Sequence, residues 1–62
     1  MYAEIHIEMD NAAFNDTPGT ELSRILNKLA TTVKNDPILD EHYQLNLMDI
    51  NGNKVGYLAI RK

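Results

Sequence analysis

An Asn-Gly pair between two strand-like runs constrains the fold of this chain more than any other feature. Asn51 and Gly52 separate residues 43–50 from residues 54–61, and both runs are rich in aliphatic and aromatic side chains. In a two-residue loop, Asn-Gly favours a type I′ turn, whose twist matches that of the flanking strands. The sequence therefore predicts an antiparallel hairpin in which the turn sets the register.

The turn assigns the hairpin residues to the two faces of a sheet. Pairing outward from it places Met48 opposite Val55, and sets Asp49 against Lys54 at the tip as a cross-strand ion pair. One face then collects the core candidates Tyr43, Leu45, Leu47, Leu58 and Ile60. The other face carries, near the turn, Met48, Ile50, Val55 and Tyr57. We expect these last four residues to form an interface.

Residues 2–9 alternate between apolar and polar side chains, which predicts a half-buried strand. Its apolar face would carry Ala3, Ile5, Ile7 and Met9. Its polar face would carry Tyr2, Glu4, His6 and Glu8. Such charge is typical of an edge strand.

The next element is an amphipathic helix that begins after Thr17, a candidate cap, with Pro18 in the first position. Its apolar stripe comprises Leu22, Ile25, Leu26, Leu29, Ala30 and Val33, and its exposed face comprises Glu21, Arg24, Asn27, Lys28, Thr31 and Thr32. Pro37 is expected to end the helix. Phe14 precedes the helix and should pack beneath its first turn; the alternative is an exposed anchor for a partner.

The order strand, helix, strand, strand predicts an α+β fold, a two-layer β-α-β-β sandwich with the helix on one face of a three-stranded sheet. The last strand is the most apolar, so we place it in the centre, in spatial order 1-3-2. This is the split β-α-β arrangement. Residues 1–62 would form a single domain.

Small size and composition favour association. The chain has 62 residues, no cysteine and a net charge of −3. Domains this small bury little surface, and without disulfides the usual support is a partner chain. We therefore expect a homodimer, joined sheet on sheet or through an edge strand. The alternative is a shallow exposed patch, since single apolar surface residues are common. No apolar run could span a bilayer, and we expect a cytoplasmic protein.

No residue pattern predicts an enzyme, a metal site or a cofactor. Glu4, His6 and Glu8 share one strand face, but three ligands without a fourth make a poor zinc site. The cations are scattered, whereas duplex binding normally uses a basic stripe. The alternative of a nucleic-acid-associated protein would use Arg24, Lys28, Lys34, Arg61 and Lys62.

Three segments carry a resemblance to known sequences: residues 10–14 (DNAAF), the helix segments 22–26 and 28–30, and residues 49–56 (DINGNKVG). Together they resemble short uncharacterised proteins encoded by bacteriophages, prophages and other mobile elements. The resemblance implies a bacterial host cell and action by binding host or viral proteins. We therefore expect a non-enzymatic accessory protein that self-associates and binds a protein partner; interference with host defence is one form.

Overall fold

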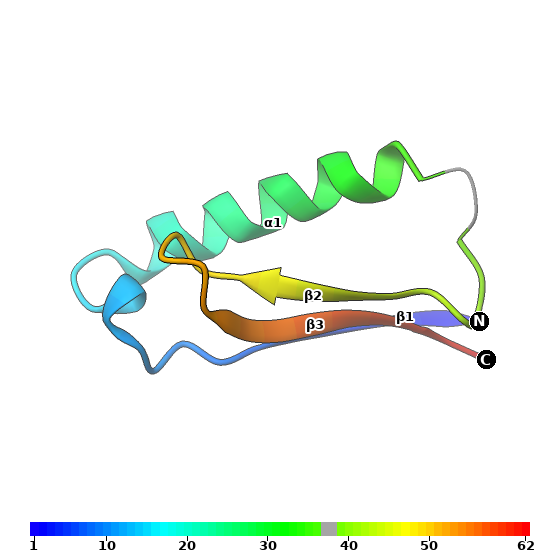
Figure 1. Ribbon diagram of the computed structural model, residues 1–62, viewed down its shortest axis with the longest axis horizontal. Coiled ribbons are helices and arrows are strands. Elements are labelled where there is room, and N and C mark those ends of the chain that lie inside the picture. Colours follow the sequence, from blue (N-terminus) through cyan, green and yellow to red (C-terminus); the bar gives the residue numbers. More distant parts are fainter. Residues whose placement is uncertain (37–38) are drawn as a thin grey trace.

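The computed structural model describes residues 1–36 and 39–62, which form one sheet with a helix against one face (Figure 1). The elements are β1 (Tyr2–Ile7), the short 3-10 helix η1 (Ala12–Phe14), α1 (Pro18–Lys34), β2 (Gln44–Met48) and β3 (Lys54–Arg61). Pro37, expected to end the helix, lies outside the described residues.

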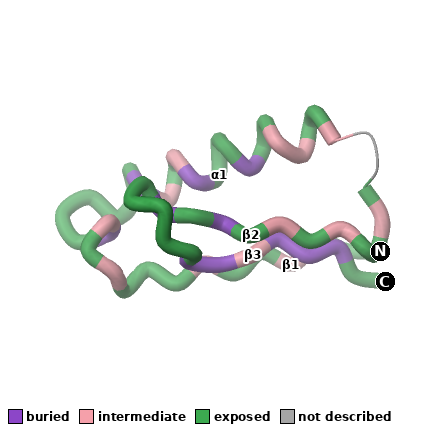
Figure 2. The backbone as a smooth tube through the Cα atoms, viewed as in Figure 1, coloured by how far each residue is buried: buried purple, intermediate pink, exposed green. Residues whose placement is uncertain are grey.

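The sheet confirms the predicted topology. Its order is β1-β3-β2, and both outer strands run antiparallel to β3. Leu58 in β3 faces Ile5 on one side and Leu45 on the other. Figure 2 shows the consequence for burial: β3 is buried along most of its length, whereas β1 and β2 are largely exposed or half-buried. The most apolar strand thus occupies the centre of a small α+β fold.

The core lies between α1 and the sheet. It comprises Phe14, Ile25, Leu29, Leu47, Val55, Leu58 and Ile60. Phe14 is only 3% exposed, so the prediction that it packs in the core is confirmed and the alternative of an exposed anchor is wrong. Asn11 positions this ring by capping η1, since its side-chain oxygen accepts a hydrogen bond from the Ala13 N–H at 3.2 Å.

The hairpin loop differs from the predicted type I′ turn. That turn requires positive φ at both central residues, but Gly52, with φ of 84°, is the one residue in the described chain that has it. The Asp49 N–H donates to the Asn53 carbonyl at 2.8 Å, and the Gly52 N–H donates to the Asp49 carbonyl at 3.1 Å. The loop therefore has three residues, 50–52, and ends on a left-handed glycine.

The three-residue loop changes the pairing of Val55 from the one predicted. Leu47 pairs with Gly56 as predicted, but Met48 pairs with Lys54, so a bulge leaves Val55 without a partner in β2. Val55 is 6% exposed and belongs to the core. Its predicted place on the open face, opposite Met48, is therefore wrong.

Candidate interaction surfaces

Asp49 organises the hairpin tip. Its carboxylate accepts hydrogen bonds from the backbone N–H groups of Asn53 (2.8 Å) and Asn51 (2.9 Å). The side-chain amides of Asn11 (2.7 Å) and Asn53 (3.3 Å) also donate to it. These bonds, led by the one from the Asn53 backbone, hold the pKa of Asp49 below its usual range. Asp49 is buried and Lys54 is exposed, so the predicted ion pair between them is wrong.

Glu21 and Arg24 attach the tip to α1. Arg24 donates from Nε and Nη2 to the two carboxylate oxygens of Glu21, at 2.6 and 3.1 Å. The Ile50 N–H donates to Glu21 at 2.9 Å, and Arg24 Nη2 donates to the Met48 carbonyl at 3.1 Å. Glu21, predicted to be exposed, is buried. The hydrogen bond from Arg24 is the main cause that lowers the pKa of Glu21, and Glu21 in turn raises the pKa of Arg24.

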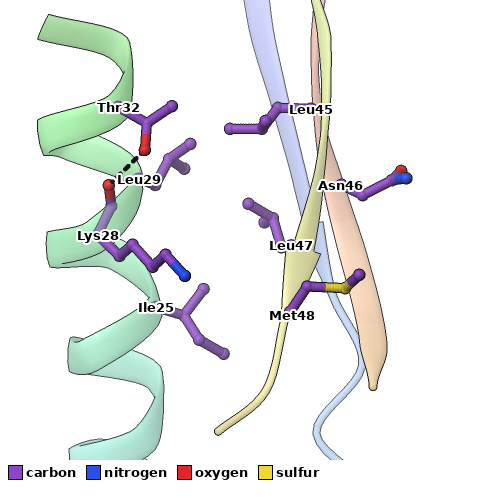
Figure 3. Close-up of a pocket in the computed structure, with 8 residues that line it drawn as sticks. All are labelled: Ile25, Lys28, Leu29, Thr32, Leu45, Asn46, Leu47 and Met48. Carbon is purple, nitrogen blue, oxygen red and sulfur yellow. Dashed lines mark hydrogen bonds between the residues drawn. The ribbon is translucent and has the colours of Figure 1, made fainter. Parts of the chain in front are cut away.

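The four predicted interface residues do not form one apolar patch. Met48 and Ile50 are 44% and 67% exposed, and Figure 3 shows the Met48 side chain pointing away from α1. Tyr57 is half-buried, and Val55 is in the core. Asn46, which faces Tyr57 across the ladder, lies on the same open face. The structure therefore leaves a small apolar tip, made by Met48 and Ile50.

The rest of the open sheet face is polar and internally bonded. The Tyr57 ring stacks on His6, with ring centroids 5.7 Å apart, and its hydroxyl donates to Glu4 at 3.0 Å. This hydrogen bond is the main cause that raises the pKa of Tyr57. His6 and Glu8 approach to 2.7 Å, and Arg61 lies 3.6 Å from Glu4. Among residues 1–36 and 39–62, no three His, Cys, Asp or Glu side chains are grouped to hold a metal ion.

The five candidate nucleic-acid residues do not lie together. Arg24 is tied to Glu21 and to the hairpin tip. Lys34 ends α1 at the opposite end of the molecule, where the chain also ends after Arg61 and Lys62 (Figure 1). Lys28 lies between these groups, on the flank of α1 that faces β2. The arrangement does not make the continuous basic stripe that a duplex backbone requires.

Two grooves flank the helix. The groove between α1 and β2, of about 220 Å³, has polar residues in its wall. Its lining comprises Ile25, Lys28, Leu29, Thr32, Leu45, Asn46, Leu47 and Met48 (Figure 3). The groove between α1 and β1, of about 320 Å³, is lined by Ala3, Ile5, Leu29, Ala30, Val33, Leu39, Leu58 and Ile60. We call the second the β1–α1 groove; every described residue that lines it is apolar.

The sequence pattern does not predict the β1–α1 groove. The helical stripe predicts that its apolar residues are covered, yet Leu26 is 41% exposed and Ala30 is also exposed. On the β1 side Ile5 is 49% exposed. The available signal was the width of the stripe, which runs from Leu22 to Val33 on more than one flank of a single helix.

None of the helices in the described part of the chain is both long enough and apolar enough to span a bilayer. Comparison with known protein families, with curated proteins and with solved structures finds no match for this chain.

Proposed function

We propose that this chain is a small phage-type accessory protein that acts by binding, both to a second copy of itself and to a protein partner, without catalysing a reaction. The observation that carries the proposal is the β1–α1 groove. Of the residues that line it, Ile5 and Leu39 are 49% and 39% exposed. Leu26, which lies one helical turn before Ala30 of the lining, is 41% exposed. An apolar groove on a domain of this size favours a macromolecular partner.

The size of the apolar surface supports concentration-dependent self-association. Fully burying an aliphatic side chain contributes about 1.5–3 kcal/mol, so covering the exposed part of each of these three residues would contribute about 1 kcal/mol. Two copies would together gain about 6 kcal/mol, against an association cost of about 4–15 kcal/mol. Apolar burial alone therefore gives weak binding, and a stable dimer needs further contacts.

The hairpin tip supports the second half of the proposal. Met48 and Ile50 are exposed, yet the backbone that carries them is fixed by Glu21 and Arg24. A tip held in one conformation loses little conformational entropy when a partner binds, which favours affinity. We therefore assign the tip to the protein partner, with a host protein of the infected bacterium as the expected class.

Affinity capture from the bacterial host tests the tip. The wild-type protein and a Gln44→Asp control should retain the same host protein. In this control the added charge lies at an exposed position of β2, far from the loop. Ile50→Asp should lose that host protein. Equal capture by all three proteins would contradict the assignment of the tip. Self-association is tested separately by sedimentation velocity, where the wild-type protein should sediment faster as its concentration rises; a monomer at every concentration would contradict that half.

A further inference from the structure

The outer edge of β1 has free backbone groups. Among the described residues, β1 has a strand neighbour, β3, on one side only. The Glu8 N–H donates to the Val55 carbonyl at 2.7 Å, and the same register continues through the pairs that β1 makes with β3. In an antiparallel ladder, alternate residues turn both backbone groups toward the neighbouring strand. Glu4 and His6 alternate with the same period as Glu8, so their N–H and carbonyl groups also point toward β3. The backbone groups that point away from β3, and are therefore free, belong to Ala3, Ile5 and Ile7.

The other edge of the sheet is protected. Arg24 donates a hydrogen bond to the outward-facing Met48 carbonyl at the end of β2, and the bulge in the β2–β3 ladder lies beside this carbonyl. Lys28 lies in the groove next to that edge. Covering groups, bulges and nearby lysines are the devices that prevent an edge strand from pairing with another chain. The edge of β1 lies beside the apolar β1–α1 groove, and among the described residues no bulge interrupts its ladder with β3. Its charged side chains, Glu4 and Glu8, lie on the open face of the sheet, where they are paired with Arg61 and His6.

We propose that the occupant of the β1 edge is a second copy of this chain, paired antiparallel through β1 about a twofold axis at Ile5. This inference rests on the self-association proposed above and specifies its surface. Ile5 would face the partner's Ile5, and Ala3 would face the partner's Ile7. All of these residues point their backbone groups outward, so each facing pair forms two hydrogen bonds.

The side chains of β1 favour this register. Antiparallel pairing sets residues of the same sheet face opposite each other, so the axis must pass through a residue of β1. An axis at Ile5 sets Glu4 against the partner's His6, which can donate a hydrogen bond to it. An axis at Glu4 would oppose the two Glu4 carboxylates, and an axis at His6 would oppose Glu4 and the partner's Glu8. Like charges that face each other directly are destabilising.

The same pairing covers the β1–α1 groove. A twofold axis perpendicular to the sheet keeps both helices on one face of the joined sheet. The two grooves then meet at the axis, with the two Ile5 side chains adjacent on their floor. Ala30, which lines the groove, and Leu26, one helical turn before it on the same flank of α1, would border the closed space from both copies. Backbone pairing thus supplies the contacts that apolar burial alone lacks.

Single-cysteine variants test the register, because the natural sequence has no cysteine. Facing residues in a hydrogen-bonded antiparallel pair have Cα atoms about 5.5 Å apart, within the range that a disulfide spans. Ile5→Cys should therefore form an intermolecular disulfide under mild oxidation. In the proposed dimer Ala3 lies four residues along the strand from the partner's Ala3, about 13 Å away. Ala3→Cys alone and Ile7→Cys alone should stay monomeric on denaturing gels, whereas a mixture of the two should cross-link.

The outcomes separate this inference from the proposed function. Asn46→Cys on β2 is the control for the other edge. Suppose that the protein dimerises by sedimentation. Cross-linking through Asn46→Cys, or failure of Ile5→Cys to cross-link, would then overturn the β1 register and leave self-association intact. A strictly monomeric wild type overturns both. If Ile5→Cys does not fold, as judged by circular dichroism, the mixture of Ala3→Cys and Ile7→Cys decides, since its cross-linking requires the same register.

Discussion

Gly56 is the one glycine of the three that lies against the backbone of a neighbouring strand, and we predict that Gly56→Ala is the most damaging of the possible Gly→Ala changes. A methyl group at Gly56 would overlap the carbonyl oxygen of His6. It would also lie 2.8 Å from the His6 carbonyl carbon and 3.0 Å from the Ile7 Cα. All three atoms belong to the backbone of β1, so no side-chain rotation relieves the overlap, and β1 must move away from β3.

The expected cost is a large part of the total stability. Overpacking of this kind costs about 1–3 kcal/mol. Displacing β1 also weakens nearby ladder hydrogen bonds, such as that from the Glu8 N–H to the Val55 carbonyl, at about 1 kcal/mol each. We therefore expect a loss of about 3–4 kcal/mol. A chain of this length has a free energy of unfolding of about 3–9 kcal/mol.

The other two glycines are matched controls. Gly52 has positive φ and open space around it, so Gly52→Ala should cost about 1–2 kcal/mol. Gly19, in the first turn of α1, has no atom within 4 Å of the added methyl group, so Gly19→Ala should be neutral or stabilise the protein by up to about 1 kcal/mol. Urea unfolding followed by circular dichroism measures all three. Equal midpoints for Gly56→Ala and Gly19→Ala would refute the close approach of β1 and β3.

Three further predictions concern the core, the hairpin tip and the open face. Phe14→Ala should lower the free energy of unfolding by about 3–5 kcal/mol, measured by the same urea titration, because Phe14 is buried in the core. The pKa of Asp49 is lowered on folding, so its contribution to stability is complete above its ordinary value of 3.8 and is lost as the pH falls through the folded pKa. Unfolding measured from pH 6 to pH 2 should therefore show a smaller acid loss for Asp49→Asn than for the wild type. The pKa of Tyr57 is raised above its ordinary value of 10.0. In an absorbance titration of tyrosine ionisation, Tyr57→Phe should therefore lack one transition that the wild type shows at a pH above the ordinary range.

The fold followed from the sequence because its main signals are local and periodic. The helical stripe, the alternation in residues 2–9 and the apolar third strand were sufficient to predict the order β1-β3-β2. The loop did not follow, because Asn-Gly suits both a two-residue turn and a three-residue loop that ends on glycine. In this structure the three-residue loop is accompanied by hydrogen bonds from residues that are distant in sequence: Glu21 accepts from the Ile50 N–H, and Asn11 donates to the Asp49 carboxylate.

The candidate surfaces were only partly predictable for the same reason. Exposure of Met48 and Ile50 followed from the pattern of the hairpin, but burial of Val55 depends on a bulge of one residue. The β1–α1 groove depends on how far a single helix covers a three-stranded sheet. Local periodicity identifies an apolar stripe; it does not say how much of that stripe the sheet reaches.

The central position of β3 has a consequence for synthesis. β1 and β2 each pair with β3 and not with each other, and β3 follows both in the chain. On the ribosome, the first strand and the helix therefore emerge before the strand that joins them to a sheet. Ile5 pairs with Leu58, which is 53 positions later in the chain. The β1–β3 ladder can therefore form only after residues 54–61 have been synthesised, through a contact of long sequence separation. During that interval both edges of β1 are open, and the nascent segment most exposed to premature pairing is the strand we assign to the dimer.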